Sequence, residues 1–282
     1  MVSDWKWGRI QSILSGFLYL FAEEARMADR FILTPYFLDT AVPGLEQLAR
    51  PGWQLNQLDL PPGEKQARMV ALYRPLASLV AGAVGAGTRP VSLAGDCCTT
   101  IGVLAGLQQA GLAPTLIWFD AHGDFNTWET TPSGFLGGMP LAMAMGLGEQ
   151  TLLAGVGLRP LAPHQIILTD GRDLDPGERE LVAQSGITHL PDVNLLRDYA
   201  LPDGPLYVHF DTDVVNPDEL PAISYPAAGG PAAETLRQLF RHLADTGRVT
   251  AVSFSAWNPD LPGSARSREL ALSLLEELLS QR

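Results

Sequence analysis

The fold of this chain is decided by Trp118-Phe119-Asp120-Ala121-His122-Gly123-Asp124, where side chains of the metal-binding type follow an apolar run. The run from Thr115 to Phe119 predicts a buried strand. On an extended chain, residues two apart point to the same side, so Asp120, His122 and Asp124 can converge. The stretch therefore predicts a polar site at the end of a strand.

A second acidic pair follows another apolar run, in Phe210-Asp211-Thr212-Asp213. Asp211 and Asp213 obey the same alternation as the first group. Four carboxylates brought together would raise one another's pKa values unless something cationic lay among them. One or two divalent ions meet that need, so the two motifs together predict a two-metal site.

The rest of the chain alternates short apolar runs with amphipathic segments. Strands are expected over Arg30–Leu33, Pro90–Ala94, Thr115–Phe119, Leu152–Val156, Gln165–Leu168, Leu206–Phe210 and Val249–Phe254. Helices are expected over Gly63–Ala86, Thr99–Gln109, Pro140–Met145, Pro176–Ser185, Ala232–Thr246 and Arg266–Ser280. This order is typical of an α/β fold with a mostly parallel sheet and helices on both faces, which binds its ligands at the carboxyl ends of the strands.

Composition limits the kind of partner. The 282 residues are 46% hydrophobic and 18% charged, which suits the large core of one domain, placed at residues 27–282. The net charge of -12 disfavours nucleic acids and anionic membranes and leaves a small-molecule substrate or a metal ion. Cys97 and Cys98 are adjacent and unsuited to a structural disulfide, which favours a cytoplasmic protein.

Residues 1–26 are read as an N-terminal extension of uncertain role. Lys6 and Arg9 precede an apolar run from Ile13 to Ala22, in the manner of a short signal peptide. A convincing small-residue cleavage site does not follow, so a peripheral helix is the alternative, and Met27 could be the start of the domain.

From about Pro90 to Pro259 the motifs resemble the ureohydrolase family of arginase, agmatinase and formiminoglutamase. Ala94-Gly95-Asp96-Cys97 stands where the family has G-G-D-H, Asp120 to Asp124 match D-A-H-x-D, and Phe210 to Asp213 match the end of S-F-D-x-D. The resemblance implies a three-layer αβα sandwich, a binuclear manganese cluster, a homo-oligomer, and hydrolysis of linear amidines.

The resemblance also implies roles for single residues. Asp120 and Asp211 would bridge two metals, Asp124 and Cys97 would complete one site, and His122 and Asp213 would complete the other. Water activated by the two cations would be the nucleophile. Asp124 would orient it and Asp213 would pass a proton to the leaving amine.

Likeness to arginase extends into the loops expected to hold substrate. Asn126 and Ser133 would bind an α-carboxylate, and Asp175, in a segment resembling R-D-x-D-P-G-E, would bind an α-ammonium. Glu178 belongs to the same segment, although both acids suit a helix start equally well. Trp257 is expected either to wall the substrate pocket or to fill the core.

Three departures from the family pattern bear on metal and substrate. Cys97 replaces a histidine ligand, and a thiolate shifts preference from manganese toward zinc, iron, cobalt or nickel. Gly137 stands where arginase has a histidine, and glycine does no acid-base chemistry. Ala256 replaces the glutamate that pairs with the guanidinium, a partner worth on the order of a few kcal/mol when buried.

His209 shares its predicted strand face with Asp211 and Asp213. It is expected to orient a neighbouring carboxylate, with direct metal ligation as the alternative. It is therefore grouped with Asp124 and Asp213 as a candidate catalytic residue.

The sequence thus predicts a binuclear metal-dependent hydrolase of a C–N bond in a guanidine or amidine group of an amino acid or derivative. Loss of the guanidinium partner points to a less basic substrate such as N-hydroxyarginine. Two alternatives stay open. One is a catalytically silent homologue that binds an amino acid, and the other is a zinc deacetylase-like amidohydrolase, which would hold one metal rather than two.

Overall fold

The computed structural model describes residues 27–280, which form a central eight-stranded sheet. Its strand order is β4-β1-β5-β10-β9-β6-β7-β8, and every neighbouring pair in it is parallel. The strands are β1 (Asp29–Thr34), β4 (Gln54–Leu55), β5 (Arg89–Ala94), β6 (Thr115–His122), β7 (Ile166–Asp173), β8 (Thr188–Leu190), β9 (Leu206–Asp211) and β10 (Val249–Ser255). A separate hairpin joins β2 (Tyr36–Phe37) to β3 (Thr40–Ala41).

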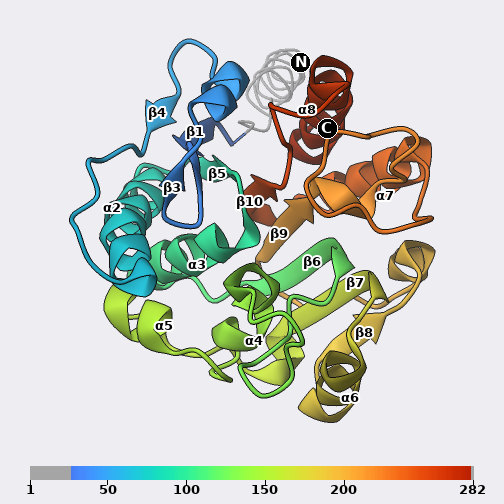
Figure 1. Cartoon of the computed structure of the whole chain (residues 1–282). Helices are drawn as coiled ribbons and strands as arrows, with labels where there is room; N and C mark the ends of the chain where they lie inside the picture. The colour runs from blue at the N-terminus through green and yellow to red at the C-terminus, as the bar shows by residue number, and fades with distance from the viewer. Residues whose placement is uncertain (1–26, 281–282) are drawn as a thin grey trace, which may run out of the picture.

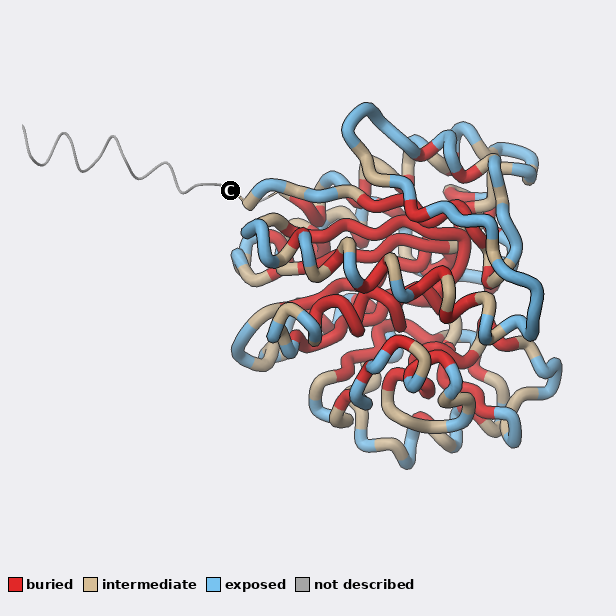
Figure 2. Tube along the Cα trace, turned by 90° about the vertical axis from the view of Figure 1, so that its left-hand side faces the viewer, coloured by how far each residue is buried: buried red, intermediate tan, exposed pale blue. Residues whose placement is uncertain are grey.

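Helices cover both faces of this sheet (Figure 1). They are α2 (Lys65–Gly85), α3 (Thr100–Gln109), α4 (Pro140–Ala144), α5 (Thr151–Val156), α6 (Pro176–Ser185), α7 (Ala233–Asp245) and α8 (Ser264–Leu279). One apolar cluster joins α2, α3, α4 and α5 to the sheet, and a second joins α7 and α8 to the other face. The predicted three-layer α/β sandwich is confirmed, with the strands buried between the layers (Figure 2).

Short 3-10 helices connect several of these elements. They are η1 (Pro43–Leu48), η2 (Cys97–Thr99), η3 (Leu136–Gly138), η4 (Pro163–Gln165), η5 (Val193–Arg197) and η6 (Thr212–Val214). Two of them lie at the carboxyl edge of the sheet: η2 begins three residues after the end of β5, and η6 follows directly on β9.

One predicted strand is wrong, because Leu152–Val156 lies within the helix α5. Its apolar residues Leu152, Leu153 and Val156 are spaced to share one helical face, and α5 packs against α2 and α3. Gly157 ends the helix with φ 72°, a left-handed conformation that glycine adopts without strain. A short apolar run of this kind cannot be assigned to strand or helix by periodicity alone.

Chain order and spatial order differ in the middle of the sheet. β5, β10, β9 and β6 are successive neighbours, although β10 comes last in the sequence. Since all four are parallel, their carboxyl ends meet along one edge. The motifs that follow these strands are thereby gathered at the centre of that edge, as expected for this class of fold.

Within residues 27–280, α2 is long and apolar enough by length and composition to cross a membrane. Its eight buried residues pack against α3, α5 and the sheet, so here it is a core helix. The expectations for residues 1–26 lie outside the described residues.

Candidate metal centre

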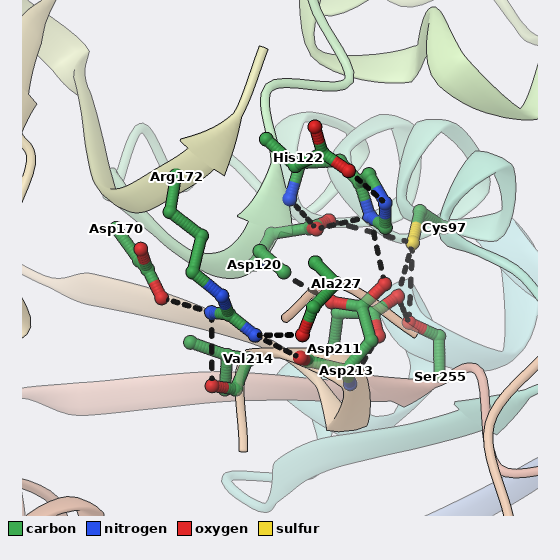
Figure 3. Close-up of polar contacts among 12 residues, drawn as sticks. Cys97, Asp120, His122, Asp170, Arg172, Asp211, Asp213, Val214, Ala227 and Ser255 are labelled. Carbon is green, nitrogen blue, oxygen red and sulfur yellow. Dashed lines mark hydrogen bonds and ion pairs between the residues drawn. The ribbon is translucent and has the colours of Figure 1, made fainter. Parts of the chain in front are cut away.

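Cys97, Asp120 and Asp211 meet where β5, β6 and β9 end (Figure 3). The Sγ of Cys97 lies 2.7 Å from Oδ2 of Asp211 and 3.9 Å from Oδ2 of Asp120. The indole Nε1–H of Trp118 donates to Oδ2 of Asp120 at 3.0 Å, which fixes that carboxylate on the cysteine side. All three candidate ligands are buried, so a thiol and two carboxylates share a space that solvent barely reaches.

His122 and Asp213 extend the cluster on its other side. Nδ1 of His122 lies 2.9 Å from Oδ2 of Asp213 and 3.4 Å from Oδ1 of Asp120. Asp213 also accepts the backbone N–H of Ala121 at 3.0 Å, which ties η6 to the end of β6. Asp120 therefore faces both halves of the cluster, as a bridging ligand must.

Asp124 reaches the same cavity by a different route from the one predicted. β6 ends at His122, and Asp124 has φ 50°. Asp124 is therefore not part of the strand, and alternation along the strand does not determine where its side chain points. Asp213 likewise lies in η6 after β9 has ended, not on an extended chain. The alternation expected for these two aspartates is wrong, because the backbone turns at the edge of the sheet and the turns aim the carboxylates inward.

Burial and mutual repulsion raise the pKa of each clustered acid. Burial and then Asp213 raise the pKa of Asp211 to about 7, and burial and then Asp120 raise that of Asp213 to about 6. The pKa values of Asp120 and Asp124 rise by the same two causes. Burial lowers the pKa of His122, but hydrogen bonds to Asp120 and Asp213 outweigh it and raise the value to about 12. The raised pKa values favour protons on these side chains when no metal cation is bound.

The residues fit a pair of divalent ions. Oδ2 of Asp124 is buried in this cavity and makes no hydrogen bond within the described part of the chain, so a carboxylate oxygen is left free for a ligand. Cys97, Asp120 and Asp211, joined by His209, form one group whose ligand atoms all lie within 4.8 Å of one another, and Asp120, His122 and Asp213 form another. Thiolate, imidazole and carboxylate are all ligands of divalent transition metals.

His209 stands behind this cluster and does not line the cavity. Its Nδ1 lies 2.7 Å from Oγ of Ser253, its Nε2 lies 3.4 Å from Oγ of Ser255, and its ring packs on Trp118 with centroids 4.0 Å apart. Full burial lowers the pKa of His209 to about 3, so the imidazole is neutral.

The hydroxyl of Ser255 connects His209 to the cluster. It donates to Oδ2 of Asp211 at 2.9 Å and lies 3.3 Å from Sγ of Cys97. We did not predict a role for Ser255 from the sequence. The sequence carries only the alternation of Ser253 and Ser255 at the end of an apolar run. Their pairing in register with His209 and Asp211 across β10 and β9 is visible only in the folded sheet.

The loop residues expected to hold substrate lie beside this cluster. Asn126, Ser133, Asp175 and Glu178 all line the cavity, which has a volume of about 190 Å³. Nδ2 of Asn126 donates to Oδ2 of Asp175 at 2.9 Å. Glu178 is buried and accepts the backbone N–H groups of Phe125 and Asp175 at 2.7 and 3.1 Å, so it shapes the loop. Burial outweighs these bonds and raises the pKa of Glu178 to about 7.

Trp257 lies outside the metal cavity. It is buried, and its Nε1–H donates to the backbone oxygen of Ser264 at 3.0 Å. It lines a neighbouring cavity of about 330 Å³. Gly137 and Ala256, the two positions where arginase has charged or titratable side chains, do line the metal cavity.

Arg172 holds the backbone beneath Asp213 (Figure 3). It pairs with Asp170 and donates to the backbone oxygens of Asp213 at 3.0 Å and Val214 at 3.2 Å. Asp170 is itself largely buried, with a pKa raised by burial despite this pairing. Arg172 therefore fixes η6, and with it the position of the Asp213 carboxylate.

Fold and site together define an α/β/α sandwich with a candidate metal centre at the carboxyl edge of its parallel sheet. The family model described as "Arginase family" matches residues 50–280. Arginase from Bacillus subtilis is 32% identical over 205 residues, which are 68% of this chain and 69% of that one. The N(omega)-hydroxy-L-arginine amidinohydrolase of Streptomyces lavendulae is 31% identical over 187 residues, covering 65% of each chain.

The solved structures agree. Arginase from Bacillus caldovelox superposes with a TM-score of 0.77 at 25% identity, covering 91% of this chain and 99% of that one. The chain therefore belongs to the arginase family. This confirms the family inferred from the motifs, and it identifies the chain as a hydrolytic enzyme of the ureohydrolase type.

Proposed function

We propose that the protein is a binuclear metal-dependent amidinohydrolase that cleaves a C–N bond in a guanidine or amidine group of an amino acid or derivative. The observation that carries this proposal is the double ligand cluster that shares Asp120. The unpartnered buried Oδ2 of Asp124, in the same cavity, supports it. Two divalent ions bound there would activate water and polarise the carbon that water attacks.

The residues of the chain supply the rest of the chemistry. Asp120 and Asp211 would bridge the two ions, Cys97 and Asp124 would complete one set of ligands, and His122 and Asp213 would complete the other. Asp124 would also orient the attacking water. Asp213 would carry a proton to the leaving nitrogen, since it faces the cavity and is backed by the contacts to His122 and Ala121.

Residues that contact the proposed ligands would keep them in place. Neutral His209 and the Ser255 hydroxyl would fix Asp211 and Cys97, as partners of metal ligands generally do. Asn126, Ser133 and Asp175 would take the amino-acid head group, and Glu178 would hold the loop that carries them. Trp257 would form part of the wall of the adjoining cavity.

The substrate we propose has a guanidine less basic than that of arginine, such as N-hydroxyarginine. Ala256 offers no carboxylate to a guanidinium, and burying a cation without a partner is costly. A relative named N(omega)-hydroxy-L-arginine amidinohydrolase is consistent with this choice. We also expect a cytoplasmic homo-oligomer, which light scattering and fractionation would test.

Turnover tests the proposal directly. Purified protein loaded with Mn²⁺ should hydrolyse N-hydroxyarginine faster than arginine, and Asp120→Asn should abolish both reactions. A clear preference for arginine would contradict the less basic substrate. Failure to hydrolyse any amidine, with metal bound, would favour the silent binding protein.

Metal analysis tests the site itself. Two ions per chain are expected, and one would favour the deacetylase-like alternative. Cys97→His should shift preference toward Mn²⁺, because imidazole replaces the softer thiolate. Full occupancy of both sites in Cys97→Ala would remove Cys97 from the ligand set.

A further inference from the structure

Three aromatic side chains from separate segments form a wall in the metal cavity. Phe37 comes from β2, Phe135 precedes η3, and Tyr225 follows η6. Their ring centroids are 6.2 Å apart for Phe37 and Phe135, 5.2 Å for Phe135 and Tyr225, and 6.5 Å for Phe37 and Tyr225. All three line the cavity that also contains Cys97 and Asp120. We call these three residues the aromatic wall.

The wall occupies the space into which a side chain at position 137 would project. A Cβ placed on Gly137 would overlap ring atoms Cε1 and Cζ of Phe135. The absence of a side chain at Gly137 is thus a condition for the position of the Phe135 ring. An apolar surface takes the place of an acid-base group at this point of the cavity.

The cavity is consequently divided by polarity. Its metal side carries Asp120, Asp124, Asp211 and Asp213, Ala256 adds only a methyl group, and a separate polar side holds Asn126, Ser133 and Asp175. The aromatic wall adds an apolar side to these polar ones, which suits a ligand that carries an apolar substituent besides its reacting group, since pockets bury apolar surface and use a few polar groups for orientation.

The wall also borders a second cavity. Phe37 and Tyr225 line both the metal cavity and the neighbouring one of about 330 Å³. Tyr225 is 50% exposed, so packing does not enclose its ring. A second hollow therefore lies open beside the wall.

We propose that the aromatic wall is a subsite for an apolar substituent of the substrate, aryl or branched alkyl, attached to the amidine or guanidine that is hydrolysed. The identity of the hydrolysed group rests on the proposed function. The subsite itself rests on Phe37, Phe135, Tyr225 and the space at Gly137.

A matched pair of amidines tests the subsite by binding alone. Benzamidine and acetamidine carry the same cationic head and differ in a phenyl against a methyl group. Calorimetric titration of the metal-loaded protein should show benzamidine binding about tenfold more tightly or better, because burying a ring of this size contributes roughly that much. Equal affinities, or no detectable binding of benzamidine, would overturn the proposal.

Variants locate the effect. Tyr225→Ala and Phe135→Ala should each reduce the preference for benzamidine severalfold and leave acetamidine binding unchanged. Trp128→Ala is the matched control, since Trp128 is exposed in a nearby loop but does not line the cavity. A preference that survives both wall variants would place the phenyl group elsewhere and refute the subsite. Tyr225 is half exposed, so its truncation should fold even where loss of Phe135 does not.

Turnover separates this proposal from the one on which it rests. Tight benzamidine binding without hydrolysis of any amidine would remove the proposed function and retain the subsite. Hydrolysis of N-hydroxyarginine without a preference for binding benzamidine would retain the proposed function and remove the subsite.

Discussion

Removing metal should make the stability of this protein fall as pH rises from the acidic range through neutrality. The reason lies in the clustered acids, which are buried together and have raised pKa values. Without a cation, burying these acids together is favourable only while they are protonated. A metal ion replaces those protons, so the loaded protein should not show the same decline.

The size of the effect follows from Asp211. Burial and then Asp213 raise its pKa from the ordinary value of 3.8 to about 7. The folded chain then holds a proton that the unfolded chain has released, so stability declines as pH rises between these values. One pKa unit corresponds to about 1.4 kcal/mol, and Asp211 alone therefore accounts for about 4 kcal/mol.

His122 acts in the same direction at higher pH. Its pKa is raised from the ordinary value of 6.5 to about 12, after its hydrogen bonds to Asp120 and Asp213 have outweighed burial. The stabilisation from protonated His122 is complete below its ordinary pKa and is lost as pH rises above it. The acids and the histidine therefore give one slope, downward with pH.

Urea-induced unfolding of chelator-treated protein, at about pH 5 and about pH 7, measures this slope. Asp211→Asn should flatten it, while Asp198→Asn, at an exposed position, should leave it unchanged. In parallel, the affinity for Mn²⁺ should increase with pH. Metal-free protein that is as stable at the higher pH as at the lower one would refute the reasoning.

Three further predictions concern the surroundings of the cluster. Gly137→His should cost about 1 kcal/mol in thermal unfolding because the outer end of the Phe135 ring fills that space and must shift, and the same substitution should cost less when compared with Phe135→Ala alone; undiminished stability in the single variant would contradict the clash. Arg172→Met should cost about 3 kcal/mol in urea because Asp170 is left buried without its partner, and Asp170→Asn in the same chain should restore part of the loss; equal stability of single and double variants would argue against the pairing. Ser255→Ala should weaken metal affinity about tenfold in a chelator competition, while the variant still unfolds in a cooperative transition. Unchanged affinity would show that Ser255 does not support the proposed ligands.

The central strands were predictable because buried parallel strands are continuous apolar runs. Thr115 to Phe119 and Leu206 to Phe210 are of this kind, and each is followed by acidic residues that mark the edge of the sheet. The short run at Leu152 was assigned to the wrong class of element because its surroundings, not its own pattern, decide between strand and helix.

The sequence predicted which side chains gather at the edge of the sheet, but not the backbone geometry that brings them together. Motif spacing brought Asp124 and Asp213 to the right edge of the sheet, whereas the positive φ of Asp124 and the turn η6 depend on local backbone conformation. No pattern in the sequence predicted the aromatic wall. Phe37 lies in β2 and Tyr225 in a loop far from it in the sequence, and only the folded chain places their rings together.

The position of β10 bears on how the chain can be assembled during synthesis. Until Val249–Ser255 leaves the ribosome, the strands before it can form only two partial sheets, β4-β1-β5 and β9-β6-β7-β8. Each then has an open edge, β5 in one and β9 in the other, where β10 should pair, an arrangement prone to pairing with foreign strands. Cys97 belongs to the first part and Asp120 and Asp211 to the second. Cys97 therefore meets Asp120 and Asp211 only after β10 has closed the sheet, whereas Asp120, His122 and Asp213 all belong to the second part and can come together earlier.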